Sequence, residues 1–93
     1  MPKASARHIL VATEAACLEL KNKIEAGADF AVVARENSSC PSGRQGGALG
    51  EFSPGQMVRE FDEVVFSGEV GKVLGPVKTQ FGYHLIEITN RTA

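Results

Sequence analysis

The sequence has 93 residues, of which 43% are hydrophobic and 23% charged, and its formal net charge at pH 7 is −1. This is an ordinary composition for one small globular domain, and the absence of a basic run argues against nucleic acid or an anionic membrane as partner. No apolar run approaches the roughly 18 residues of a membrane span, and the N-terminus lacks the apolar core of a signal peptide. Two cysteines are too few for a disulfide framework. We therefore expect a reduced, cytoplasmic, monomeric domain over residues 1–93, and Met1 favours a free protein.

The first part of the chain predicts one strand and two helices. Residues 7–12 form a short, partly β-branched apolar run that is typical of a central strand. Thr13 can cap a helix that Gly27 ends, and Asp29 can cap a second helix that ends near Asn37. Apolar residues at helical spacing mark the inward faces of both helices: Cys17, Leu20, Ile24, Phe30, Val33 and Ala34.

A glycine-rich loop follows over residues 38–61, with a candidate short strand at 49–52. Five of the ten glycines lie between Gly43 and Gly55. Glycine is entropically costly in a folded chain unless the backbone needs a positive φ or a close approach to another segment. The loop is therefore expected to have a defined shape.

Met57 begins a third predicted helix, which ends at Gly68. Met57 and Phe61 stand one helical turn apart and would by default belong to the core. Because they follow the glycine-rich loop, with Leu49 and Phe81 available nearby, we interpret them as one wall of a small apolar pocket.

The end of the chain predicts a hairpin. Gly75–Pro76 opens a strand at 77–79, residues 80–82 form a turn, and residues 83–89 form a closing strand rich in β-branched and aromatic residues. The final hairpin implies antiparallel pairing. We therefore predict an α+β fold in which helices pack on a small sheet.

The two histidines lie in the first and last predicted strands. A two-residue period places His8 beside Leu10 on one strand face and His84 beside Ile86 on another. If these strands are central neighbours, the two imidazoles meet on one face and can bond through ring nitrogens, with Thr79 fixing one tautomer. The alternative is that each histidine is an ordinary core residue.

The two cysteines differ in their setting. Cys17, on a helix stripe, reads as a small buried hydrophobic residue, whereas Cys40 lies in a polar loop where a thiol can be reactive. A Cys–His nucleophile is one interpretation of Cys40. Zinc is disfavoured because the close ligand spacing of structural sites is missing, and a phosphate-binding loop is disfavoured because no Gly-Lys-Ser/Thr follows the glycines.

Seven segments, in order along nearly the whole chain, carry a likeness to a known family. They are His-Ile-Leu-Val at 8–11, Gly-Ala-Asp-Phe at 27–30, Ser-Ser-Cys-Pro-Ser-Gly at 38–43, Gly-Gly-Ala-Leu-Gly-Glu-Phe at 46–52, Gly-Gln-Met at 55–57 with Phe61, Gly-Pro-Val at 75–77, and Phe-Gly-Tyr-His at 81–84. Together they resemble a parvulin-type peptidyl-prolyl cis/trans isomerase, and the minimal single-domain bacterial parvulins above all.

This resemblance implies the parvulin (FKBP-like) fold, a four-stranded antiparallel sheet surrounded by about four helices. It implies that His8 and His84 are the paired histidines, Cys40 the active-site thiol and Thr79 the hydroxyl that supports the histidines. It also implies a proline pocket and its border: Leu49, Met57 and Phe61, with Gln56 and Phe81. No cofactor or metal is expected.

The expected activity is non-covalent isomerisation of X-Pro bonds in proline-containing peptides and in unfolded or nascent proteins. The branch of the family that selects phosphoserine or phosphothreonine has a basic loop after the first strand, whereas this chain has no arginine or lysine there until Lys21. We therefore expect no phosphate dependence, and an uncharged or apolar residue before proline. The alternatives are a non-catalytic chaperone module that binds proline segments and, least favoured, a cysteine hydrolase.

Overall fold

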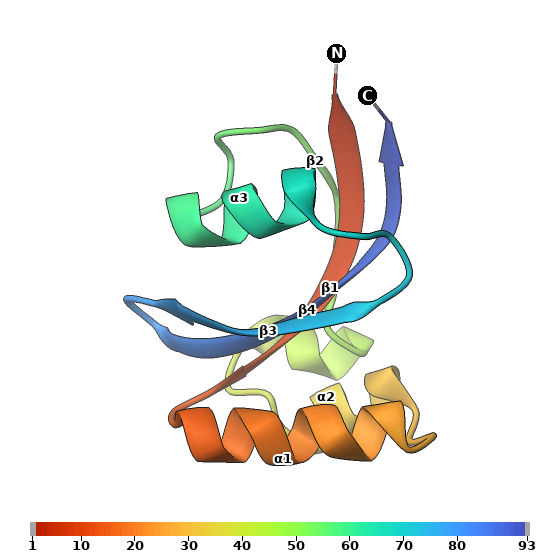
Figure 1. Cartoon of the computed structure of the whole chain (residues 1–93), viewed down its shortest axis with the longest axis vertical. Coiled ribbons are helices and arrows are strands. Elements are labelled where there is room, and N and C mark those ends of the chain that lie inside the picture. The colour runs from red at the N-terminus through yellow and green to blue at the C-terminus, as the bar shows by residue number, and fades with distance from the viewer. Residues whose placement is uncertain (1, 93) are drawn as a thin grey trace.

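The computed structural model describes residues 2–92, which form one four-stranded antiparallel sheet with helices on both faces (Figure 1). The strands are β1 (Lys3–Val11), β2 (Ala48–Phe52), β3 (Val73–Thr79) and β4 (Gly82–Thr92). The helices are α1 (Glu14–Glu25), α2 (Phe30–Asn37), α3 (Arg59–Ser67) and the short 3₁₀ helix η1 (Pro41–Gln45). The predicted α+β class and four-stranded sheet are confirmed, with three α-helices and one 3₁₀ helix where about four helices were expected.

The strand order is β2-β1-β4-β3, so the first and last strands are the central neighbours of the sheet. Their register pairs Leu10 with His84 and His8 with Ile86. Both ends of the described chain therefore lie side by side (Figure 1). The predicted adjacency of the two histidine-bearing strands is confirmed.

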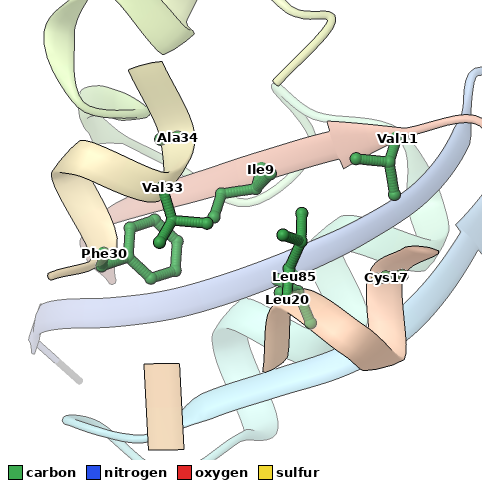
Figure 2. Packing of buried hydrophobic residues seen from close by; sticks show 8 residues of the cluster. All are labelled: Ile9, Val11, Cys17, Leu20, Phe30, Val33, Ala34 and Leu85. Atoms are coloured by element: carbon green, nitrogen blue, oxygen red, sulfur yellow. The ribbon is translucent and has the colours of Figure 1, made fainter. Parts of the chain in front are cut away.

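Helices α1 and α2 cover one face of the sheet and α3 covers the other (Figure 1). The core under α1 and α2 contains apolar side chains from both helices and both central strands (Figure 2): Ile9, Val11, Cys17, Leu20, Phe30, Val33, Ala34 and Leu85. A second apolar core lies under α3: Ala4, Ala6, Phe52, Phe61, Val65 and Ile86. No helix within residues 2–92 combines the length and apolar character that crossing a membrane requires.

The first two helices begin where their caps predict. The Thr13 hydroxyl accepts a hydrogen bond from the Ala16 N–H at 3.2 Å, and the Asp29 carboxylate accepts one from the Ala31 N–H at 2.9 Å. Each cap satisfies a backbone donor that the first helical turn leaves free. Gly27 follows α1 with a φ of 118°, as predicted for the residue that ends it.

The third helix begins two residues later than predicted, at Arg59 with Val58 as its N-cap, so Met57 lies in the preceding loop. Local hydrogen bonds hold that loop in a non-helical conformation. The Gln56 side-chain oxygen accepts from the Ser53 N–H at 2.6 Å, and the Asp62 carboxylate accepts from the Gly55 N–H at 3.0 Å.

Strand β3 begins at Val73, four residues before its predicted start at Val77. Pro76 lies inside the strand, where the register with β4 shifts between Leu74 and Val77. Proline has no N–H to donate to a neighbouring strand. It is tolerated here because β3 is an edge strand and its pairing with β4 is irregular at this point. The outer ends of β1 and β4 also exceed their predicted lengths because they pair with each other.

Candidate functional site

The site is built around two stacked histidines under α3. His8 on β1 and His84 on β4 are 5% and 4% exposed, and their ring centroids lie 5.2 Å apart with an interplanar angle of 15°. The His8 Nδ1 and His84 Nδ1 atoms are 3.0 Å apart, and His84 Nε2 lies 2.8 Å from Thr79 Oγ1. The structure thus brings the three side chains together as the sequence analysis predicted.

A fourth and a fifth side chain extend this group to the thiol. His8 Nε2 lies 3.1 Å from Ser42 Oγ, and the Ser42 hydroxyl donates to Cys40 Sγ at 3.2 Å. The result is a continuous hydrogen-bond chain, Thr79–His84–His8–Ser42–Cys40. It joins β3, β4 and β1 to η1 and to the residue that precedes η1.

The direction of each bond in this chain follows from its ends. Because the Ser42 hydroxyl donates to sulfur, its oxygen accepts the proton on His8 Nε2, which leaves His8 Nδ1 as an acceptor. His84 Nδ1 then donates to His8, and His84 Nε2 accepts from the Thr79 hydroxyl. Thr79 Oγ1 in turn accepts the Phe81 N–H at 3.1 Å. All four ring nitrogens and both hydroxyl protons are thus used with both histidines neutral.

Burial keeps the histidines in that neutral form. Desolvation, with a smaller contribution from His84, lowers the pKa of His8 from 6.5 to about 4. Burial likewise lowers the pKa of His84. The Phe61 ring packs edge-on against both imidazoles, with centroids 5.5 Å from His8 and 5.8 Å from His84. The pair is therefore suited to holding geometry and not to acting as an acid or base at pH 7.

Ser42 is the member of this chain that the sequence analysis missed. Its position two residues after Cys40 in the Ser-Ser-Cys-Pro-Ser-Gly segment was a signal, but its reach to His8 depends on η1, which was not predicted. The glycine-rich loop brings η1 against β1. The His8 N–H donates to the Gly47 carbonyl at 3.0 Å, and a Cβ on Gly47, whose φ is 85°, would overlap the His8 carbonyl oxygen.

An apolar cavity of about 380 Å³ opens beside the histidines. Its lining includes seven of the predicted site residues: His8, Cys40, Leu49, Met57, Phe61, Phe81 and His84. Leu10, Pro41 and Val58 also line it and were not predicted. Phe81, at the turn between β3 and β4, is 61% exposed at the cavity.

Two predicted residues lie outside the cavity lining. Thr79 acts from behind, through its hydrogen bond to His84. Gln56, which the resemblance placed at the border of the pocket, does not line it, because its amide oxygen is bonded to the Ser53 N–H in the loop before α3. Cys17 is buried among apolar side chains, and burial raises the pKa of its thiol to about 11, so it is a core residue as predicted.

The fold and the site together define a parvulin-type domain: an apolar cavity of side-chain size beside a neutral polar network on the α3 face of the sheet. Residues 2–90 match the family described as Rotamase, PPIC-type PPIASE domain. The chain belongs to this family of peptidyl-prolyl isomerase domains.

Similar proteins support this family assignment and show how much of a longer relative the chain covers. The chain is 47% identical over 91 residues to the foldase protein PrsA of Geobacillus kaustophilus, which is 97% of this chain and 32% of that protein. A crystal structure of the peptidylprolyl isomerase PrsA from Bacillus anthracis matches 99% of this chain and 43% of its own, with a TM-score of 0.95 and 35% identity. The chain thus spans about a third of the length of the curated relatives it matches.

A structure of similar size matches almost end to end. The solution structure of NmPin, the parvulin of Nitrosopumilus maritimus, has a TM-score of 0.87 and 35% identity, over 97% of this chain and 98% of that one. The parvulin resemblance found in the sequence is confirmed.

Proposed function

We propose that this domain accelerates cis/trans rotation about X-Pro bonds in peptides and in unfolded or nascent proteins, without a phosphate requirement, and so assists folding. The observation that supports this most directly is the apolar cavity bordered by Cys40 at the end of a neutral hydrogen-bond chain. A proline ring is apolar and rigid, and its amide is polar. The cavity and the thiol provide a matching place for each.

Rotation about a peptide bond is slow because it breaks amide resonance, at a barrier of roughly 18–20 kcal/mol. In the twisted transition state the prolyl nitrogen becomes pyramidal and the carbonyl oxygen loses negative charge. Only interactions that favour the twisted amide over the planar one accelerate the reaction. Leu49, Met57 and Phe61 hold the ring, and their apolar surroundings disfavour the planar, strongly polar amide.

Cys40 has an electrostatic role in this proposal. The Ser42 hydroxyl fixes the sulfur, whose lone-pair density faces the carbonyl of the residue before proline and disfavours its fully polarised form. No substrate bond is made or broken in isomerisation, so a covalent nucleophile has no step to perform. A trapped thioester with a peptide that is turning over would contradict this role.

The lack of a phosphate requirement rests on the connection between β1 and α1. Only residues 12–13 separate Val11, the end of β1, from Glu14, the start of α1, so no basic loop is present between them. The monomeric state and the cytoplasmic location stay predictions. Sedimentation of the purified domain at several concentrations tests the first.

The decisive experiment measures cis-to-trans rates for two peptides, one with leucine and one with phosphoserine before proline. We expect acceleration of the leucine peptide by the wild-type domain and a slower reaction with Cys40→Ala. Binding of the peptide with no acceleration would support a chaperone module that binds proline segments. Mass spectrometry of the recovered peptide checks its integrity, since shortened products would indicate a hydrolase.

A further inference from the structure

A second hollow, of about 460 Å³, lies directly beside the proline cavity. The two share part of their lining, namely Ser39, Cys40 and Pro41. The second hollow differs from the proline cavity because two charged side chains, Arg35 and Arg44, line it. Nothing in the proposed isomerisation uses these two guanidinium groups.

The two arginines come from different elements and line the same hollow in the folded chain. Arg35 lies in the last turn of α2 and Arg44 in the last turn of η1. Both are exposed, and neither has an ion-pair partner among residues 2–92. No acidic residue lines this hollow. By contrast, Arg7 and Arg59 are paired with glutamates.

We propose that this hollow, the Arg35–Arg44 subsite, binds the carboxylate of an acidic residue immediately before the proline. The inference rests on the proposed function. When the ring occupies the apolar cavity, the carbonyl that faces Cys40 belongs to the preceding residue, whose side chain then lies next to the shared wall. Successive Cα atoms are only about 3.8 Å apart, so that side chain reaches the adjoining hollow.

The chemistry of the subsite favours an anion with two oxygens. Guanidinium groups present several N–H donors in a planar fork that matches a carboxylate. The Ser38 hydroxyl oxygen accepts from the N–H groups of Leu10 and Cys40, which leaves its proton free to donate as well. A carboxylate before proline differs from the uncharged or apolar residue expected from the sequence, because Arg35 and Arg44 line the same hollow as Cys40.

The test compares kcat/KM for peptides that differ only in glutamate or glutamine before proline. We expect the wild-type domain to favour the glutamate peptide about fivefold at low salt, the size of effect that two exposed ion pairs produce. This ratio should approach one in Arg35→Gln with Arg44→Gln, and it should fall as salt screens the charges. Arg59→Gln, which removes one positive charge at an arginine outside the hollow, should keep the wild-type ratio.

The outcomes separate this inference from the proposed function. Acceleration of both peptides with a ratio near one in the wild type overturns the subsite but leaves the isomerase. No acceleration of any peptide overturns the isomerase itself. An equal loss of the ratio in Arg59→Gln shows a general effect of charge and overturns the subsite. A phosphoserine peptide much faster than the glutamate peptide assigns the hollow to phosphate and overturns the carboxylate.

Discussion

The two faces of this sheet are covered differently, although they share the same central strands. Under α1 and α2 the packed side chains are apolar throughout (Figure 2). Under α3 the apolar core adjoins three buried polar residues, His8, Thr79 and His84, and a cavity that opens to solvent. We call these the closed face and the open face.

The difference shows how a small domain keeps stability and chemistry apart. The eight buried residues of the closed face include no charged, hydroxyl or imidazole side chain, so apolar packing stabilises this face. The open face has one helix, which leaves space for a ligand. His8, Thr79 and His84 are tolerated there because each has a hydrogen-bond partner in the chain from Thr79 to Cys40. The comparison predicts that the two faces respond differently to substitution and to pH.

The largest effect is expected on the closed face, from Leu20→Ala. Removing a buried leucine side chain leaves a cavity and should lower the free energy of unfolding by about 2–5 kcal/mol, measured by urea denaturation. At temperatures where the variant is folded, kcat/KM should equal that of the wild type. Leu18→Ala on the same helix is the matched control, because Leu18 is 43% exposed and its loss should change stability little. A folded Leu20→Ala variant with impaired turnover would contradict the separation of the faces.

Acid should weaken the open face. The pKa of His8 is about 4 in the folded domain and 6.5 when unfolded, so between these values the unfolded chain binds the extra proton. The free energy of unfolding therefore has its full value above pH 6.5, and it falls by up to about 3 kcal/mol as pH falls toward 4.

Urea denaturation at pH 7.0, 5.5 and 4.5 measures this loss, and the NMR shift of the His8 Cε1 proton assigns it. Leu20→Ala should show the same pH dependence as the wild type, since no histidine lies on the closed face. A His8 that titrates near pH 6.5 in the folded domain would refute the explanation.

Met57→Ala should affect binding more than stability. Met57 is half-buried in the loop before α3 and lines the cavity, so its loss removes apolar contact with the proline ring. We expect peptide affinity to fall about five- to tenfold, on the scale of one or two methylene groups. Fluorescence titration with a labelled peptide measures this, with Leu18→Ala again as control. Unchanged affinity would remove Met57 from the binding site.

The smallest effect tests whether the hydrogen-bond chain acts as a unit. Ser42→Ala removes the link between His8 and Cys40 and should cost about 0.5–1.5 kcal/mol of stability. It should also lower kcat with little change in KM, and the slowly exchanging proton on His8 Nε2 should disappear from the NMR spectrum. Ser42→Thr keeps the hydroxyl and should restore both. If Ser42→Ala kept the kcat and the proton, the link would have no role.

Much of the site could be predicted because its members fall in short motifs whose order is that of the parvulin family. His8, His84 and Cys40 all line the cavity, and the two-residue period correctly placed both histidines on one face. Ser42 and the Arg35–Arg44 subsite could not be predicted. Ser42 reaches a histidine 34 residues away in the sequence, and the hollow that Arg35 and Arg44 line depends on how η1 packs against α2.

What the sequence determined by itself was local. The side chains of Thr13 and Asp29 bond to N–H groups two or three residues away, so the starts of α1 and α2 needed no other part of the chain. The tertiary structure alone decided the start of β3 at Val73 and the route of hydrogen bonds from Thr79 to Cys40. Each of these depends on contacts between segments that only the folded sheet brings within bonding distance.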